Sequence, residues 1–275
     1  MSLKITTLIE NSAGEHHGLH SEHGLSFFIE KDDLKVLFDT GQTGFFIKNA
    51  EQLGIDLTSL NYVVLSHGHY DHSGGLRSLA QLTTTFKLVL GQGFFEKKYG
   101  SNNNSHEYLG NNFDENFLAE KNISYQYTTR KNTKLAPGIN ILTNFPRLHA
   151  DETINPRFKI LKDKTFIQDP FTDELLLAID SPKGLIVLLG CSHPGMKNML
   201  DFTKDTLKKP IHAILGGTHL VEATTASLKE SISYLQRNDL KIIGVSHCTG
   251  QAAIDQLAIV GDRFFHNHTG SFLVV

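Results

Sequence analysis

The sequence has no tryptophan and only two cysteines, Cys191 and Cys248, among its 275 residues. Two cysteines in a chain of this length exclude the disulfide framework on which small secreted proteins depend, so stability must come from a packed core. Apolar residues make up 40% of the chain and charged residues 20%, as in ordinary soluble proteins. The length suits one large domain or two closely packed halves.

Long apolar runs are also missing. No stretch approaches the ~20 apolar residues that a transmembrane helix requires, and the first residues lack the basic and apolar regions of a signal peptide. A net charge of −3 gives no electrostatic reason to expect nucleic acid or an anionic membrane as a partner. We therefore expect a cytoplasmic protein that acts on a small molecule. The sequence does not indicate an oligomeric state.

Histidine, in contrast, is abundant, with 15 residues. Three histidines and one aspartate fall close together, as His67, His69, Asp71 and His72. An apolar run precedes them and an amphipathic helical pattern follows, so they occupy a loop between a strand and a helix. Imidazole and carboxylate groups bind zinc, and also iron and manganese. We predict a metal-binding loop here, because isolated polar residues would not explain four ligand-type side chains at this spacing.

Three later strand-like runs also end in polar motifs that contain histidine. In α/β proteins, binding sites gather where strand ends meet the following loops, so these motifs are expected to complete a site for two divalent metal ions. Zinc is the expected metal, with iron or manganese as alternatives. The runs and motifs are 185–189 with Cys191 and His193, 211–215 with His219, and 241–245 with His247.

The roles of these later residues differ. His193 and His247 are predicted metal ligands. His219 is either a ligand or a residue that contacts the ligands or the substrate. Cys191 is either a thiolate ligand or an inert buried thiol, and Cys248 is expected to pack in the core.

Two polar stretches have a weaker pattern. Residues from about 91 to 136 carry several aromatic side chains, and we predict a lid insertion there; a surface excursion is the alternative. Within it, Lys97 and Lys98 are expected to be a solvated pair. Residues 146–164 are either a solvated loop or a receiver for an anionic substrate group, through Arg147, His149, Arg157 and Lys159. The histidine-rich stretch containing His16, His17 and His20 is either a metal tract or a surface loop.

The pattern His67-x-His69-x-Asp71-His72 resembles the signature of the metallo-β-lactamase superfamily. The resemblance implies an α/β fold, a four-layer αββα sandwich of two mixed β-sheets, formed by residues 1–275 as a single domain. It implies that His67 and His69 serve one metal, and Asp71 and His72 a second. It also implies that Asp39, at the end of the preceding strand, supports the loop through hydrogen bonds without binding metal.

One departure from the superfamily pattern stands out. Where members carry a bridging aspartate after a strand-end glycine, this sequence has Cys191 after Gly190, followed by His193. Either Cys191 takes that place as a thiolate, or His193 ligates in its stead.

Several motifs together resemble one branch of metal-dependent hydrolases, which includes a dihydropterin-ribofuranosylaminobenzene-phosphate synthase. In the motif of residues 22–26, His23 is predicted either to face the site or to lie on the surface. The other motifs are 39–42, 66–75, 190–195, 216–220 and 247–250.

The predicted function is that of a metal-dependent hydrolase, in which a metal-activated hydroxide attacks an ester, lactone or phosphate-ester substrate. Asp71 and His219 are the predicted catalytic residues. A synthase of the methanopterin-pathway type, joining a pterin to a ribosyl-phosphate arene, is one alternative. A non-catalytic metal-binding sensor is another. Redox chemistry is disfavoured, because diiron redox members of the superfamily have glutamate where this chain has His69.

Overall fold

The computed structural model describes residues 2–16, 18–102, 105–237 and 239–275. His17, in the histidine-rich stretch, and Asn103 and Asn104, in the predicted lid insertion, lie outside these ranges. The chain forms two compact units. Unit 1 comprises Met1–Thr128, Asn155–Asp173 and His268–Val274, and unit 2 comprises Thr129–Ile154, Glu174–Asn267 and Val275.

Unit 1 is built on a seven-stranded mixed sheet. Strands β3, β4, β5 and β8 run parallel to one another, whereas β17, β1, β2 and β3 pair antiparallel. In sheet order, the strands are β17 (Phe272–Val274), β1 (Leu3–Ile9), β2 (Ser26–Lys31), β3 (Leu34–Phe38), β4 (Tyr62–Val64), β5 (Lys87–Gly91) and β8 (Tyr125–Thr128).

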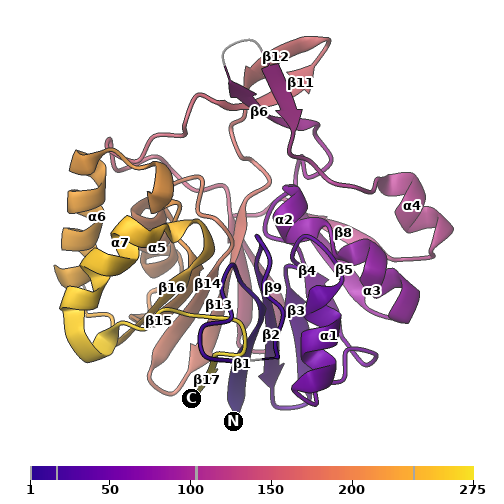
Figure 1. Ribbon diagram of the computed structural model, residues 1–275, viewed down its shortest axis with the longest axis horizontal. Coiled ribbons are helices and arrows are strands. Elements are labelled where there is room, and N and C mark those ends of the chain that lie inside the picture. The colour runs from indigo at the N-terminus through magenta and orange to yellow at the C-terminus, as the bar shows by residue number, and fades with distance from the viewer. Residues whose placement is uncertain (1, 17, 103–104, 238) are drawn as a thin grey trace. The chain divides into compact units, whose positions relative to one another are not determined.

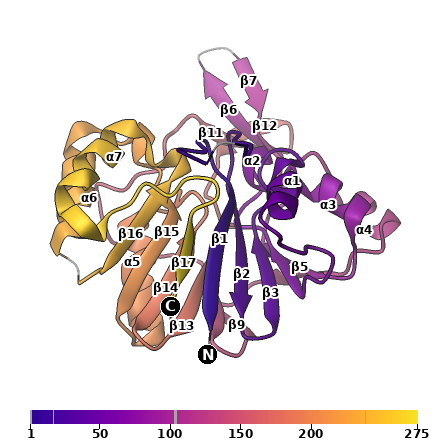
Figure 2. The same ribbon diagram turned by 60° about the horizontal axis from the view of Figure 1, so that its bottom comes forward.

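Helices cover one face of this sheet (Figures 1 and 2). Alternate side chains along the strands, such as Phe28, Leu37 and Val63, form one core cluster with Phe46 and Leu79 from the helices. The alternation arises because successive side chains of a strand point to opposite faces. The helices are α1 (Phe45–Gln52), α2 (Tyr70–Ser73), α3 (Leu76–Leu82) and α4 (Glu115–Glu120).

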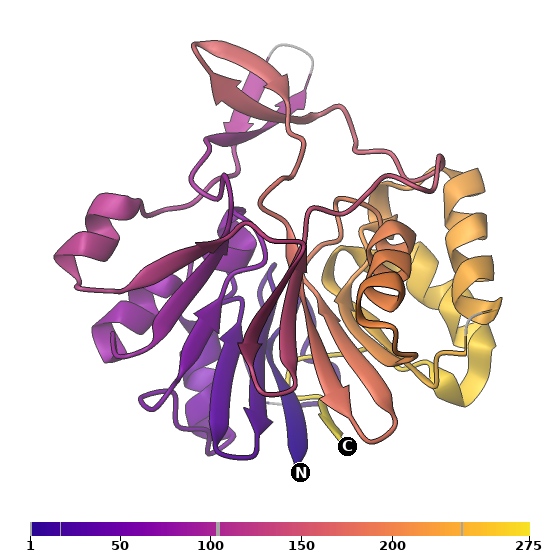
Figure 3. The ribbon, with the colours of Figure 1, turned by 180° about the vertical axis from the view of Figure 1, so that it is seen from behind.

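A second, four-stranded antiparallel sheet belongs to the same unit and lies beyond one end of the larger sheet (Figures 1 and 3). It joins two hairpins that are distant in sequence. One comes from the predicted lid stretch. The other begins in the stretch 146–164, whose sequence pattern is weak, and ends at Gln168. In sheet order, the strands are β12 (Thr165–Gln168), β11 (Phe158–Lys162), β6 (Lys98–Asn102) and β7 (Ser105–Tyr108).

Unit 2 contains a six-stranded mixed sheet, seen from behind in Figure 3. Strands β14, β15 and β16 are parallel neighbours, so their carboxyl ends lie at the same edge. In sheet order, the strands are β16 (Ile242–Ser246), β15 (Ile211–Gly217), β14 (Gly184–Leu189), β13 (Leu175–Ser181), β10 (Ile139–Thr143) and β9 (Asn132–Ala136).

Helices of unit 2 supply the other half of its core. Met199 and Leu200 of the first of them pack with Val187 and Ile214 of the strands. The α-helices are α5 (Met196–Leu207), α6 (Thr225–Arg237) and α7 (Gln251–Leu257), and the 3-10 helices are η1 (Leu220–Glu222), η2 (His247–Thr249) and η3 (Ala258–Arg263).

The α/β class and the two mixed sheets are confirmed as predicted. A tight turn joins β13 to β14, where Ser181 pairs with Gly184. In the part of the chain that the structure describes, no helix combines the length and apolarity that crossing a membrane requires.

Candidate metal centre

The predicted metal-binding loop follows β4 in unit 1 and continues into α2. His67 and His72 are fully buried, and His69 and Asp71 are each only 6% exposed. The short helix begins at Tyr70, so Asp71 and His72 project from its first turn, whereas His67 and His69 precede it. The change from extended to helical backbone therefore brings four ligand-type side chains of one short segment together.

Ring nitrogens converge within this loop. The Nε2 atom of His67 lies 3.1 Å from the Nδ1 atom of His69. Two nitrogens bound to one tetrahedral zinc at ~2.0–2.1 Å are separated by about 3.3 Å, so this spacing fits a shared metal. The ring of His72 lies 4.3 Å from that of His67, measured between centroids. The donor set and its spacing thus suit a borderline divalent metal.

Asp39 holds the loop from the end of β3. Its Oδ1 atom accepts the backbone N–H of Ser66 at 2.7 Å, and its Oδ2 atom accepts the Ser66 hydroxyl at 2.7 Å. The same Oδ2 atom lies 2.7 Å from Nδ1 of His72. An imidazole that donates through Nδ1 presents Nε2 as a metal ligand. Asp39 is fully buried and has a φ of +60°, a left-handed conformation that costs backbone energy.

The surroundings of His67 favour a neutral ring. Burial, reinforced by the neighbouring His72 and His69, lowers the pKa of His67 well below its ordinary value. Metal binding requires the deprotonated imidazole, so the ring is in its ligand form at neutral pH.

His23 lies beside the loop. Its Nε2 atom is 3.2 Å from Oδ2 of Asp71, and its side chain is 54% exposed. The same Asp71 oxygen lies 3.7 Å from Nε2 of His72. His23 therefore contacts a predicted metal ligand from a solvent-accessible position.

Unit 2 gathers the later motifs at the shared edge of β14, β15 and β16. The side-chain ligand atoms of Cys191, His193 and His219 all lie within 4.8 Å of one another. The same holds for Cys191, His247 and Cys248. The rings of His193 and His219 are 4.2 Å apart between centroids. Adjacent parallel strands thus bring together the residues that were predicted from separate motifs.

The two cysteines differ in their contacts. The Cys248 thiol donates to the backbone carbonyl of Cys191 at 3.4 Å, and its sulfur accepts the backbone N–H of His219 at 3.3 Å. Cys248 therefore ties two strand-end loops together. Cys191 is 3% exposed and belongs to both of the ligand groups just described.

The motif after β14 is fixed by a buried carboxylate that sequence reasoning missed. Glu174 is 1% exposed, and its Oε1 atom accepts the backbone N–H of Ser192 at 2.7 Å. The Ser192 hydroxyl donates to the carbonyl of Gly217 at 2.8 Å, which links the loops after β14 and β15. Ser192, His219 and His247 all have positive φ values, between 52° and 65°. Such strain in non-glycine residues is common at functional sites.

Two of the basic residues in the stretch 146–164 contact groups of the protein itself. The His149 Nε2 atom lies 2.8 Å from Oδ2 of Asp201, so this histidine has a local carboxylate partner. Arg147 approaches the backbone carbonyl of His193 at 3.5 Å, and burial lowers its pKa against the opposing effects of Glu174 and Glu152.

Arg157 occupies a different environment, in unit 1. Its guanidinium lies 4.1 Å above the ring of Phe158. That ring is in turn 5.7 Å from the ring of His69, between centroids. A single aromatic side chain therefore separates this cation from the metal-binding loop.

Lys98 contradicts the expectation of a solvated pair. Its neighbour Lys97 is exposed, but Lys98 is 1% exposed, and its Nζ atom donates to Asp169 at 2.8 Å and to Asp173 at 2.9 Å. Burial alone lowers the pKa of Lys98, but Asp173 and Asp169 outweigh it and raise the pKa to about 12. Lys98 is the first residue of β6 and points inward, whereas Lys97 directly precedes the strand and is exposed.

This buried charge network contacts the metal-binding loop directly. The Oδ2 atom of Asp173 accepts the backbone N–H of Gly68, between the first two histidines, at 2.7 Å. Phe171 lies between the two aspartates, and its ring packs edge-on against His69 with centroids 5.5 Å apart. The Lys98 ammonium lies 4.8 Å from the centre of that same ring. No local pattern in the sequence signals this network, because its members come from β6 and from the segment after β12.

Comparisons with known proteins agree with the sequence motifs. The family model described as the metallo-beta-lactamase superfamily matches residues 22–85. The 7,8-dihydropterin-6-methyl-4-(beta-D-ribofuranosyl)-aminobenzene-5'-phosphate synthase of Methanocaldococcus jannaschii is 30% identical over 270 residues, which cover 90% of this chain and 88% of that protein. An uncharacterized protein of the same archaeon is 28% identical, with 98% of this chain and 99% of that protein covered.

Solved structures show the same fold. The crystal structure of Tm1679, a metal-dependent hydrolase of the beta-lactamase superfamily, matches with a TM-score of 0.86 and 27% identity, covering 98% of each chain. A diphosphatase of the PhnP family matches with a TM-score of 0.56 and 17% identity, over 100% of this chain and 98% of that one, and supports the fold alone.

The Lys98 network leads to a prediction about stability. Replacing Lys98 with Met leaves two buried carboxylates without their cation, which is expected to lower the free energy of unfolding by ~3–5 kcal/mol. Urea denaturation followed by circular dichroism measures this change. The matched control is Lys97→Met, one residue away on the exposed face, which is expected to change the free energy of unfolding by less than ~0.5 kcal/mol. Equal losses in both variants would contradict the assigned roles.

Proposed function

The chain belongs to the metallo-β-lactamase superfamily, and we propose that it is a hydrolase that uses divalent metal ions to cleave an ester, lactone or phosphate-ester bond. The single observation that carries this proposal is the buried convergence of His67, His69, Asp71 and His72 around nitrogens 3.1 Å apart. The whole-length similarity to a metal-dependent hydrolase supports it.

The proposed metal ligands come from both sets of motifs. In unit 1, His67 and His69 bind one ion, and Asp71 and His72 bind a second. In unit 2, His193 and His247 are the proposed histidine ligands, and Cys191 is the proposed replacement for the bridging aspartate. The close grouping of the unit 2 residues around the Cys191 sulfur supports this assignment. Zinc is the proposed metal, because the set combines imidazole, thiol and carboxylate groups.

A pair of such ions, when bound, supplies a hydroxide nucleophile at neutral pH and polarises the bond to be cleaved. The chain's own residues orient and protect that chemistry. Asp39 holds the His72 ring through Nδ1, so that Nε2 faces the metal position. Asp71 Oδ2 is the proposed acceptor for the proton of the attacking water, with His23 Nε2 beside it at 3.2 Å. His219 is the second proposed catalytic group, donating to the leaving oxygen.

An anionic substrate group is proposed to bind near Arg157. Its guanidinium is held by the face of Phe158, next to His69. Guanidinium groups pair with carboxylates and phosphates through parallel hydrogen bonds, which suits either a lactone-derived acid or a phosphate ester. The four-stranded sheet that presents this residue is the proposed lid over the loop.

A synthase activity is the second candidate, favoured by the similarity to the methanopterin-type synthase over 90% of the chain. In that function, the same metals would act as Lewis acids while a pterin and a ribosyl-phosphate arene are joined. Arg157 would then receive the phosphate. The two candidates share the metal centre and differ in the substrate.

Replacing His69 with Ala is expected to remove bound metal and to abolish turnover. Removing one ligand leaves the first ion with an incomplete set, and ligand loss of this kind prevents formation of the nucleophile. Elemental analysis gives the metal content, and hydrolysis of activated esters, lactones and bis(4-nitrophenyl) phosphate gives the activity. His106→Ala, on exposed strand β7, is the control and should retain both. Full activity in the His69 variant would refute the proposal.

The role of Cys191 is testable with cobalt. A cobalt-substituted protein is expected to show a thiolate-to-cobalt charge-transfer band in the near ultraviolet, because a ligating thiol is deprotonated by the metal. The band should be absent in Cys191→Ser and retained in Cys248→Ser, the matched thiol. Loss of the band only in the Cys248 variant would identify Cys248 as the ligand and contradict the proposed role of Cys191.

The synthase candidate is tested by binding. Calorimetric titration of the metal-loaded chain with a pterin and with a ribosyl-phosphate arene is expected to give saturable binding of both if the chain is a synthase, and product formation follows by chromatography. Absence of binding for both compounds, together with hydrolysis of a simple ester, would exclude the synthase and support the hydrolase.

A further inference from the structure

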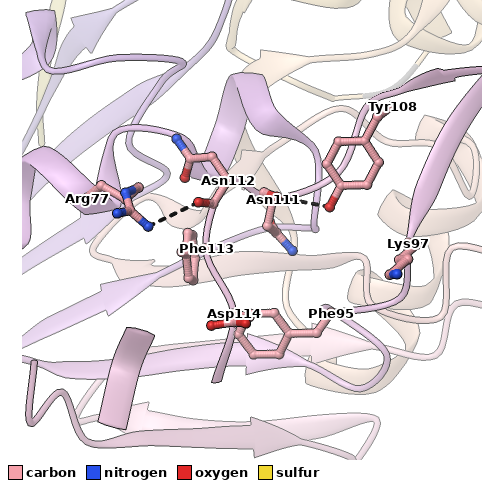
Figure 4. A pocket seen from close by; sticks show the side chains of 8 residues that line it. All are labelled: Arg77, Phe95, Lys97, Tyr108, Asn111, Asn112, Phe113 and Asp114. Atoms are coloured by element: carbon pink, nitrogen blue, oxygen red, sulfur yellow. Dashed lines mark hydrogen bonds between the residues drawn. The ribbon is translucent and has the colours of Figure 1, made fainter. Parts of the chain in front are cut away.

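A cavity of about 410 Å³ opens on unit 1, away from the proposed ligands themselves (Figure 4). Small-molecule sites usually occupy ~300–1,000 Å³, so its size suits a compact ligand. The lining residues come from α3, from the loop between β5 and β6, and from the end of β7 with the loop that leads to α4. They are Arg77, Phe95, Lys97, Tyr108, Asn111, Asn112, Phe113 and Asp114.

Aromatic rings form the apolar part of the cavity. The Phe95 and Phe113 rings pack edge to face, with centroids 5.8 Å apart. Phe113 is 6% exposed, so it is a fixed wall. The Tyr108 hydroxyl donates to the backbone carbonyl of Asn111 at 2.9 Å, which holds the phenol ring at the rim. Flat, fixed rings favour a planar ligand, which can stack or pack edge to face against them.

The charges around the cavity favour an anion. Arg77 donates to the Asn112 carbonyl at 3.2 Å, and its guanidinium stacks 4.4 Å from the centre of the Phe117 ring. A guanidinium has five N–H donors, so donors remain for a ligand. Among the residues that the structure describes, no carboxylate pairs with the ammonium of Lys97.

The one carboxylate at the cavity is already engaged. Asp114 caps α4, and its Oδ1 atom accepts the backbone N–H of Phe117 at 2.9 Å. The lining therefore carries two cations, Arg77 and Lys97, and one carboxylate, Asp114, so the cavity has a net positive charge.

Hydrogen bonds connect two residues of the cavity lining to the end of the metal-binding loop. The Asn111 side chain is 7% exposed; it accepts the Ser73 hydroxyl at 2.7 Å and donates to the Phe94 carbonyl at 2.8 Å. The Asn112 amide donates to the carbonyl of Gly74 at 3.0 Å. Because Ser73 directly follows a predicted metal ligand, the cavity and the loop share one hydrogen-bonded wall.

We propose that this cavity is a binding site for a small aromatic anion, an arene or heteroarene that carries a carboxylate or a phosphate. The ring lies against Phe95, Phe113 and Tyr108. Arg77 and Lys97 line the cavity from opposite sides, and their positive charges attract the anionic group (Figure 4). The site is separate from the proposed metal ligands, and its existence does not depend on the hydrolase proposal.

Calorimetric titration of the full zinc-loaded chain tests the site, with phenylphosphonate and benzoate as the two probes. Neither can be hydrolysed. Phenylphosphonate represents a phosphate group, and benzoate carries a carboxylate. Methylphosphonate lacks the ring, and benzyl alcohol lacks the charge. Phenylphosphonate and benzoate are expected to bind at least tenfold more tightly than either control compound, because each lost interaction removes a charged hydrogen bond or a ring contact.

Variants locate the binding. Arg77→Met and Lys97→Met are each expected to weaken phenylphosphonate binding about tenfold, since each removes one of the two positive charges that attract the anion. Lys162→Met, an exposed lysine on β11 of the same unit, is the matched control and should bind as the unchanged chain does. Lys97 is itself exposed, so its variant tests the proposal even if the Arg77 variant unfolds.

Several results would overturn the proposal. Undetectable binding of both aromatic anions would do so, as would equal affinity in the Lys97→Met and Lys162→Met variants, which would assign the probe to another site. Binding of methylphosphonate as tight as that of phenylphosphonate would refute the aromatic requirement. Equally tight binding of benzyl alcohol would refute the anionic one.

Discussion

The buried carboxylate of Asp39 is the constraint on which the metal-binding loop depends. It lies at the end of β3 without solvent, so every hydrogen bond it makes must come from the protein. It accepts from the backbone and hydroxyl of Ser66 and faces Nδ1 of His72. One side chain therefore fixes both the start of the loop and the ring orientation of a histidine six residues later. A left-handed backbone at Asp39 is tolerated because these bonds compensate for its cost.

A second carboxylate acts on the same loop from another direction. Asp173 accepts the N–H of Gly68 and is itself held by Lys98. Burial raises the pKa of Asp173, and the neighbouring Lys98 opposes that rise. Two carboxylates thus hold the loop by hydrogen bonds. One is Asp39, at the end of β3 in the seven-stranded sheet, and the other is Asp173, in the segment that follows the four-stranded sheet. A loop held at both ends can keep several polar groups buried at fixed spacing, which metal binding requires.

The sequence predicted the parts of this structure that depend on local pattern. The strand ends before His193, His219 and His247 could be found because a buried parallel strand is a short apolar run and its end is marked by glycine and polar residues. The loop ligands could be found because their spacing is local. Lys98 could not be placed, since a lysine's environment depends on partners 71 and 75 residues away in the sequence. Strand β11 was missed for a related reason, because it pairs with a hairpin from a different segment and has only partial alternation.

The proposed role of Cys191 distinguishes this metal centre from one that has a bridging carboxylate. A bridging carboxylate offers two oxygens and accepts hard and borderline metals alike, whereas a thiol offers one soft sulfur. In unit 2, that sulfur lies within 4.8 Å of the ligand atoms of His193 and His219, and also of those of His247 and Cys248. Cys191 is therefore the member common to both of these groups. If it binds metal as proposed, its sulfur favours zinc over magnesium or manganese. Its thiol must then lose a proton when metal binds, so metal affinity should rise with pH.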